Sequence, residues 1–130
     1  MKKLTSKPAA PLGEPSVGQI PPFEVLTMSS DGEVVVSVHG EIDMATAPHL
    51  WEHLAGAIPG ATHRLVVDLR DTPFIDSTGL AVFVRALKRV RHQGSEFVLR
   101  SPQANARKIL RVTGLDRVMT ITDSSDAPAG

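Results

Sequence analysis

The fold is decided by one stretch of the chain, residues 65–92, which reads LVVDLRDTPFIDSTGLAVFVRALKRVRH. It opens with a nearly continuous apolar, β-branched run at 65–69, a pattern typical of a central strand buried on both faces. Residues 78–92 then follow the spacing of an amphipathic helix with one apolar face, and Gly94 terminates the pattern. The stretch therefore predicts a buried strand, a loop over residues 71–76 and a helix.

Upstream of this stretch the sequence predicts a β-hairpin and another helix. The hairpin strands are expected at 23–28 and 33–38, joined by residues 29–32, whose Asp-Gly pair tolerates positive φ. Apolar residues at helical spacing predict a helix over residues 46–58, with Thr46 as its cap and Pro48 in its first turn.

Downstream, strand and helix patterns alternate once more. We expect a strand at 96–100, a helix at 103–112 that ends before Gly114, and a last strand at 118–121. Such alternation predicts a single α/β domain, with a mixed, mostly parallel sheet that opens with the hairpin and packs against the helices.

Composition separates this domain from both ends of the chain. Residues 1–22 contain five prolines and few large apolar side chains, which predicts a disordered arm. Residues 23–123 carry all of the folding pattern, and residues 124–130 form a polar stretch that we expect to be a flexible tail.

The charge balance and the missing cysteines exclude several classes of function. Lysine plus arginine and aspartate plus glutamate each total 14, so no net charge draws the chain to nucleic acid or to an anionic membrane. There is no cysteine, which excludes disulfides and thiolate chemistry. No uninterrupted apolar run is long enough for a membrane span. We therefore expect a cytoplasmic protein that binds neither nucleic acid nor membrane.

Two acidic loops are candidates for the functional site. Ligands and partners of open α/β sheets meet the loops at the carboxyl ends of the strands. The predicted topology puts residues 40–43 (GEID) and 74–80 (FIDSTGL) at that edge. Ser77 falls where the chain turns from strand to helix, so its hydroxyl is either the cap of the helix or an exposed acceptor.

These loops carry a resemblance to a known family. Together with residues 113–118 (TGLDRV), the GEID and FIDSTGL segments resemble the STAS domain of bacterial anti-sigma factor antagonists. The resemblance covers residues 23–123, in order and with suitable spacing, and its most specific part is DSTGL at 76–80.

The resemblance implies a function and a set of site residues. A protein of this kind, when unmodified, binds an anti-sigma factor with serine-kinase activity and so frees a sigma factor. The resemblance places the phosphorylated residue at Ser77 and implies a separate serine phosphatase that resets the switch. It implies no catalytic residue, no cofactor and no metal. The residues expected to contact the partner are Asp43, Asp76, Ser77, Thr78, Gly79 and Leu80.

Three enzyme patterns compete with this interpretation. Residues 49–53 (HLWEH) match the His-x-x-Glu-His pattern of inverted zinc proteases, but that site needs a third ligand, and a solvated helix face explains the pattern as well. Residues 76–79 (DSTG) resemble the Asp-Thr-Gly loop of aspartic proteases, with one residue too many. Ser77 lacks the Gly-x-Ser-x-Gly surroundings of a hydrolase nucleophile, because Ile75 stands at the first glycine position.

Several functions without catalysis also fit the sequence. The basic residues of the predicted 78–92 helix fit nucleic acid or an acidic partner, although such a run usually marks the solvated face of a helix. A STAS-like scaffold or transport-associated module, and a small-nucleotide-binding module, both stay open. The basic residues are Arg85, Lys88, Arg89 and Arg91.

Overall fold

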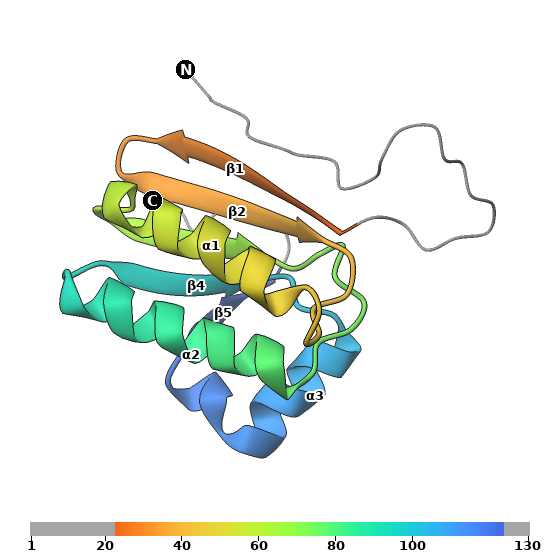
Figure 1. Ribbon diagram of the computed structural model, residues 1–130. Helices are drawn as coiled ribbons and strands as arrows, with labels where there is room; N and C mark the ends of the chain where they lie inside the picture. Colours follow the sequence, from red (N-terminus) through yellow and green to blue (C-terminus); the bar gives the residue numbers. More distant parts are fainter. Residues whose placement is uncertain (1–22, 124–130) are drawn as a thin grey trace, which may run out of the picture.

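The computed structural model describes residues 23–123, so the expected arm at 1–22 and the expected tail at 124–130 lie outside the described residues. The described chain forms one mixed sheet with helices packed on it (Figure 1). In chain order the elements are β1 Glu24–Ser30, β2 Glu33–His39, α1 Ala47–Ala57, η1 Ile58–Gly60, β3 Arg64–Asp68, α2 Ser77–His92, β4 Glu96–Arg100, α3 Ala104–Thr113, η2 Leu115–Arg117 and β5 Thr120–Thr122.

The strands follow the order β1-β2-β3-β4-β5, with β1 antiparallel to β2 and the other neighbours parallel. This confirms the predicted mixed, mostly parallel α/β sheet. The hairpin turn is tighter than expected, because Ser29 and Ser30 extend β1 and pair with β2. Only Asp31 (φ 46°) and Gly32 (φ 82°) remain in the turn, and a side chain at Gly32 would meet His63 at 2.6 Å.

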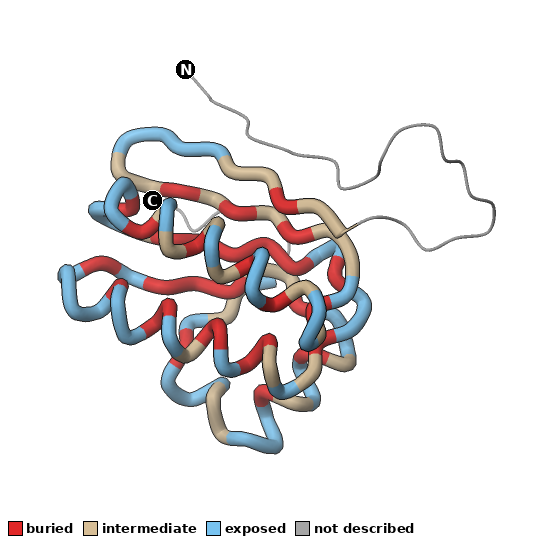
Figure 2. Tube along the Cα trace, viewed as in Figure 1, coloured by how far each residue is buried: buried red, intermediate tan, exposed pale blue. Residues whose placement is uncertain are grey.

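The core lies between one face of the sheet and the helices. Alternate residues of β2, at 34, 36 and 38, point into it, and β3 contributes Leu65 and Val67, both fully buried. Val66, between them, is also only 1% exposed, which confirms the prediction that this strand is buried on both faces. Figure 2 shows the buried residues following the strands and the sheet-facing sides of α1 and α2.

The last strand begins later than expected. The sequence predicted it at 118–121, but β5 is Thr120–Thr122. The difference arises because η2 follows α3, and the backbone N–H groups of Val118 and Met119 donate to the Leu115 carbonyl. Those two residues therefore close a turn before pairing with β4 begins. None of the helices between residues 23 and 123 is both long and apolar enough to cross a bilayer.

Candidate functional site

The two acidic loops meet at the carboxyl edge of the sheet, as the topology predicted. Ile42 and Ile75 form an isolated parallel bridge that joins the loop after β2 to the loop after β3. The Ile42 N–H donates to the Phe74 carbonyl at 2.9 Å, and the Asp76 N–H donates back to the Ile42 carbonyl at 3.1 Å. Both isoleucine side chains are buried, so they fix the loops to the core.

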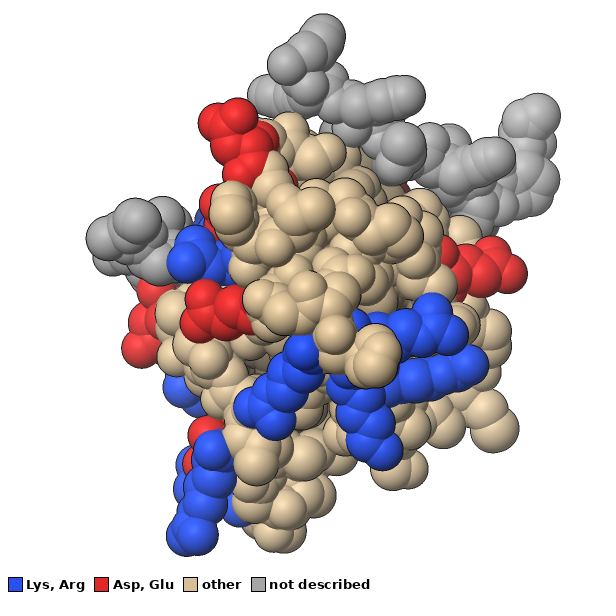
Figure 3. All heavy atoms as spheres, turned by 90° about the vertical axis from the view of Figure 1, so that its left-hand side faces the viewer, with Lys and Arg blue, Asp and Glu red and all other residues tan. Residues whose placement is uncertain are grey.

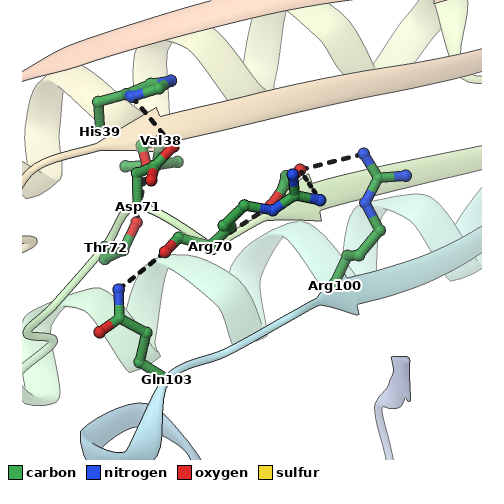
Figure 4. A network of polar contacts seen from close by, with 8 residues as sticks. Val38, His39, Arg70, Asp71, Thr72, Arg100 and Gln103 are labelled. Carbon is green, nitrogen blue, oxygen red and sulfur yellow. Dashed lines mark hydrogen bonds and ion pairs between the residues drawn. The ribbon is translucent and has the colours of Figure 1, made fainter. Parts of the chain in front are cut away.

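The loop that leads to Ser77 is anchored at its start. Figure 4 shows Arg70, Asp71 and Thr72 held between the ends of neighbouring strands. The buried Thr72 hydroxyl donates to the Val38 carbonyl at 2.8 Å, and the Arg70 carbonyl accepts from the Gln103 amide at 2.8 Å. These hydrogen bonds tie the loop to β2 and to Gln103, the N-cap residue of α3.

Two further contacts extend this anchoring. His39 and Asp71 approach to 3.4 Å between Nδ1 and Oδ2, which links the end of β2 to the same loop. Nearer Ser77, the Ile75 N–H donates to the Asn105 side-chain oxygen at 2.8 Å, which ties the loop to α3. The entry into α2 is therefore supported by β2 and by α3.

Asp76, not Ser77, caps α2. Its Oδ1 accepts from the backbone N–H of Thr78 at 2.8 Å, from that of Gly79 at 3.3 Å, and from the Thr78 hydroxyl at 2.5 Å. The hydrogen bond from the Thr78 hydroxyl is the main cause that lowers the pKa of Asp76; the backbone donors act in the same direction and partial burial opposes them. The interpretation of Ser77 as the cap is therefore wrong, and the Asp76 carboxylate is charged at neutral pH.

Ser77 is the first residue of α2, and it is exposed. Within residues 23–123 its hydroxyl has no hydrogen-bond partner, whereas the adjacent Thr78 hydroxyl is occupied by Asp76. At this end of α2 the Ser77 hydroxyl is therefore available for modification, whereas the Thr78 hydroxyl is held by Asp76.

Asp43 shapes the loop after β2. Its Oδ1 accepts from the backbone N–H groups of Ala45 at 2.9 Å and Thr46 at 3.1 Å. The Thr46 hydroxyl donates to the Glu41 carbonyl at 2.8 Å and accepts from the Asp43 N–H at 2.9 Å. Thr46 is thus the N-cap residue of α1, as expected, but its side chain makes no capping hydrogen bond, because its hydroxyl is turned back into the loop.

Gly79 and Leu80 lie beneath the site. Leu80 is 8% exposed, and a Cβ at Gly79 would stand 2.7 Å from the Ile75 side chain and 2.8 Å from that of Ile42. Glycine is needed here because α2 runs directly against the bridge between the two loops. These two residues can therefore influence a partner through the packing of the loops, while Asp43, Asp76, Ser77 and Thr78 are at least partly accessible.

Sequence reasoning missed two exposed apolar residues in the same loops. Met44 follows Asp43 and is 72% exposed, and Phe74 precedes Ile75 and is 40% exposed. Methionine and phenylalanine are enriched in protein interfaces relative to the rest of the surface, so these two side chains are candidates for contact with a partner. The signal in the sequence was their position, outside every strand and helix periodicity.

The competing enzyme patterns find little support in the described geometry. His49 and His53 stack edge to face with ring centroids 4.9 Å apart, and His49 also contacts Phe23. No group of three potential metal ligands occurs in the described part of the chain. The carboxylate of the DSTG segment is the helix cap, and no base within residues 23–123 contacts the Ser77 hydroxyl.

Comparison with known proteins places this geometry in context. The family model of the STAS domain matches residues 25–127. The anti-sigma-B factor antagonist of Bacillus subtilis (strain 168) is 35% identical over 98 residues, which cover 75% of this chain and 88% of the relative. That of Staphylococcus aureus (strain NCTC 8325 / PS 47) is 29% identical over 104 residues, covering 80% and 96%. The crystal structure of an anti-sigma factor antagonist from Mycobacterium paratuberculosis aligns with a TM-score of 0.67 and 32% identity, covering 77% and 85%.

Proposed function

Since the chain belongs to the STAS domain family, we propose that it acts as an antagonist of an anti-sigma factor with serine-kinase activity. In its unmodified form it binds that anti-sigma factor and so releases a sigma factor, and phosphorylation at Ser77 ends the binding. A serine phosphatase restores the active form. The protein works in the cytoplasm, as a regulator without catalytic residues or cofactor.

The availability of the Ser77 hydroxyl carries this proposal. It is exposed at the first position of α2, without a hydrogen-bond partner among the described residues. The exposed side chains of Met44 and Phe74 lie in the two loops that join beside it. We expect a partner that binds these joined loops to come close to Ser77, so a kinase that binds here has its acceptor at the interface.

The cap explains why the modification is expected on Ser77 and not on Thr78. Phosphorylation of Thr78 would require its hydroxyl to leave Asp76 Oδ1, which it contacts at 2.5 Å, and would place phosphate beside that carboxylate. Ser77 can be modified without loss of any described hydrogen bond of the cap. We therefore expect phosphorylation to leave α2 intact.

Phosphate changes the interface more than the fold. It adds a charge of about −1.5 to −2 and three acceptor oxygens. The positive end of the α2 dipole stabilises that charge in the free domain. In a complex, the phosphate would have to lose water beside the charged Asp76 carboxylate and against apolar surface, which is unfavourable. Phosphorylation is thus expected to weaken the complex while the domain stays folded.

The remaining interpretations differ in what they require of Ser77. A scaffold or transport-associated STAS-like module needs no kinase, and a small-nucleotide binder at the same loops would bind nucleotide without any protein partner. Only the antagonist requires a partner that both binds the loops and phosphorylates Ser77.

The test is an affinity purification from the protein's own cell extract with wild-type and Ser77→Ala proteins as bait. We expect both baits to retain the same anti-sigma factor, and the retained material to phosphorylate wild type at Ser77 when ATP is added. Met44→Asp should lose that partner. Its matched control is Val112→Asp, which changes an equally exposed apolar residue on α3 (74% against 72%). Retention of no Ser77-directed kinase would contradict the proposal.

A further inference from the structure

A second surface lies at the other end of α2, where the carboxyl ends of α1 and α2 run side by side. Between them is a hollow of about 470 Å³. One wall is apolar and the rim is basic, and Figure 3 shows Lys and Arg side chains gathered on this side of the molecule. The residues that line the hollow are Ala55, Ile58, Pro59, Lys88, Arg89, His92 and Gln93.

Four cations gather on α2. Among residues 23–123, the arginines at 64, 70, 100 and 107 all form ion pairs with carboxylates. No ion pair within this described part involves the α2 cations Arg85, Lys88, Arg89 and Arg91. The same is true of Lys108, Arg111 and Arg117. Arg91 differs from the other three α2 cations, because its guanidinium donates to the Val118 carbonyl at 2.7 Å. The helix dipole accounts for cations in the last turn of α2 but not for Arg85 and Lys88, which lie before it.

Trp51 on α1 holds two of these cations in place. The Arg85 guanidinium carbon lies 4.2 Å from the centre of the indole ring, and that of Arg89 lies 5.2 Å away. Stacking uses the face of a guanidinium group and leaves its N–H edge free to bind a carboxylate at two points. The two arginines are thus partly ordered before any partner binds, which lowers the entropy cost of binding.

The apolar wall is also held rigidly. Ile58 is 4% exposed, and the Gln93 side-chain amide donates to the carbonyls of Ile58 at 2.8 Å and Ala61 at 3.1 Å. This bridge fixes the end of α2 to η1, so the hollow keeps its shape without a ligand.

We propose that this hollow, the α1/α2 basic hollow, binds an acidic segment of a protein partner that inserts one apolar side chain between carboxylates. Lys88 and Arg89 at the rim supply charge complementarity, and the wall of Ala55, Ile58 and Pro59 receives the apolar side chain. Single-stranded nucleic acid fits less well, because the Trp51 ring on which a base would stack already carries guanidinium groups. Membrane insertion fits less well, because no exposed large apolar side chain of the described residues lines the hollow.

This surface is separate from the one that contains Ser77. Lys88 follows Ser77 by eleven positions along α2, which at a rise of about 1.5 Å per residue corresponds to roughly 16 Å. The hollow therefore binds its partner whether or not Ser77 is phosphorylated, and the inference does not depend on the proposed function.

The test uses the peptide acetyl-Glu-Glu-Leu-Glu-Glu-amide as probe, with Gln-Gln-Leu-Gln-Gln and Glu-Glu-Gly-Glu-Glu versions for comparison. Trp51 is the only tryptophan, so its fluorescence reports binding at this surface, and calorimetry measures the affinity. We expect saturable binding that weakens as salt screens the charges. Both comparison peptides should bind more weakly than the probe. The glutamine version, which lacks the carboxylates, should bind most weakly of the three.

Variants of the full chain locate the site. Lys88→Glu should lower the affinity about tenfold, equivalent to about 1.4 kcal/mol. Ala55→Glu should also lower it, since it adds a carboxylate to the wall without removing a cation. The matched control Lys108→Glu, on exposed α3 surface, and Ser77→Asp should both leave it unchanged.

Circular dichroism confirms that each variant is folded. Absence of saturable binding, equal affinity in the Lys88→Glu and Lys108→Glu variants, or a tenfold loss in Ser77→Asp would overturn the proposal. The proposal would also be overturned if a thymidine oligonucleotide or phosphatidylglycerol vesicles bound more tightly than the probe and Lys88→Glu abolished that tighter binding.

Discussion

Asp76 and Thr78 form a closed pair at the start of α2: one carboxylate oxygen of Asp76 accepts from the Thr78 hydroxyl at 2.5 Å and from the Thr78 N–H at 2.8 Å. Ser77 stands between them in sequence but takes no part in this pair. Asp76 therefore caps the helix, and the proposed phosphorylation site is a different side chain, that of Ser77.

Replacement of the cap should affect stability far more than replacement of the serine. We expect Asp76→Ala to lower the free energy of unfolding by about 0.5–2 kcal/mol, the usual cost of losing an N-cap. Ser77→Ala, an exposed change without a hydrogen bond to lose, should stay within about 0.5 kcal/mol of wild type. Urea unfolding followed by circular dichroism measures both. Equal losses would restore Ser77 as a cap.

The same cap predicts a pH dependence. The folded state lowers the pKa of Asp76, chiefly through the Thr78 hydroxyl, so the charged carboxylate stabilises the fold at pH values above its unfolded pKa of about 3.9. That contribution is lost as the pH falls through the lower, folded pKa. The stability difference between wild type and Asp76→Ala should therefore be constant near neutrality and shrink below about pH 4. A difference that stays constant down to acid unfolding would contradict the assignment.

Gly79 should tolerate no side chain, because the side chains of Ile42 and Ile75 occupy the space that a Cβ at this position would need. Gly79→Ala is expected to cost about 1–3 kcal/mol, as overpacking of a core does. Gly56→Ala is the matched control on α1: nothing lies within 4 Å of its added Cβ. That change should stabilise the protein by about 0.5–1 kcal/mol through helix propensity. Thermal unfolding of both variants separates packing from propensity, and a neutral Gly79→Ala would show that the loops can move apart.

The histidine pair should bind no metal at stoichiometric level. Burial lowers the pKa of His53, and His49 beside it acts in the same direction while Glu52 opposes both. The two rings lack a third ligand within the described residues. Elemental analysis of the purified protein should find no stoichiometric zinc. Zinc that is present in wild type and absent from His53→Ala would show that the helix carries a metal site.

Periodicity was sufficient to predict the hairpin, the helices and a mostly parallel sheet. It could not decide between Asp76 and Ser77 as cap, because both residue types are good caps and the choice depends on which side chain turns toward the helix. It could not place β5 either, since Val118 and Met119 have strand propensity but are used by a turn that forms with Leu115.

The sequence predicted that the loops at 40–43 and 74–80 lie together at one edge of the sheet, and the structure confirms this. The sequence does not show which small residues of the DSTGL segment stay accessible: Ser77 is exposed, whereas Gly79 is buried. That distinction arises from the bridge between Ile42 and Ile75, a contact between distant parts of the chain. Met44 and Phe74 lie outside the periodicity of every strand and helix, but that position alone does not show that the assembled loops leave both side chains exposed.

The Ser77 switch itself predicts a graded series of affinities for the anti-sigma partner. Ser77→Ala adds no charge and should bind as wild type while resisting the kinase. Phosphate brings like charges together in the interface, and one such contact at about 6 Å costs on the order of 3 kcal/mol at an effective dielectric constant near 20. A cost of that size corresponds to roughly a hundredfold loss of affinity. Ser77→Asp should reproduce only part of it, because a carboxylate carries less charge than a phosphate.

The most direct measurement is a calorimetric titration of the purified anti-sigma partner with four forms of the protein: unmodified, phosphorylated at Ser77, Ser77→Ala and Ser77→Asp. Circular dichroism confirms that each form is folded, and mass spectrometry confirms the position of the phosphate. We predict wild-type affinity for Ser77→Ala, an intermediate loss for Ser77→Asp and a loss of about a hundredfold for the phosphorylated form. Equal affinity of the phosphorylated and unmodified forms, or phosphate located on Thr78, would contradict the Ser77 switch.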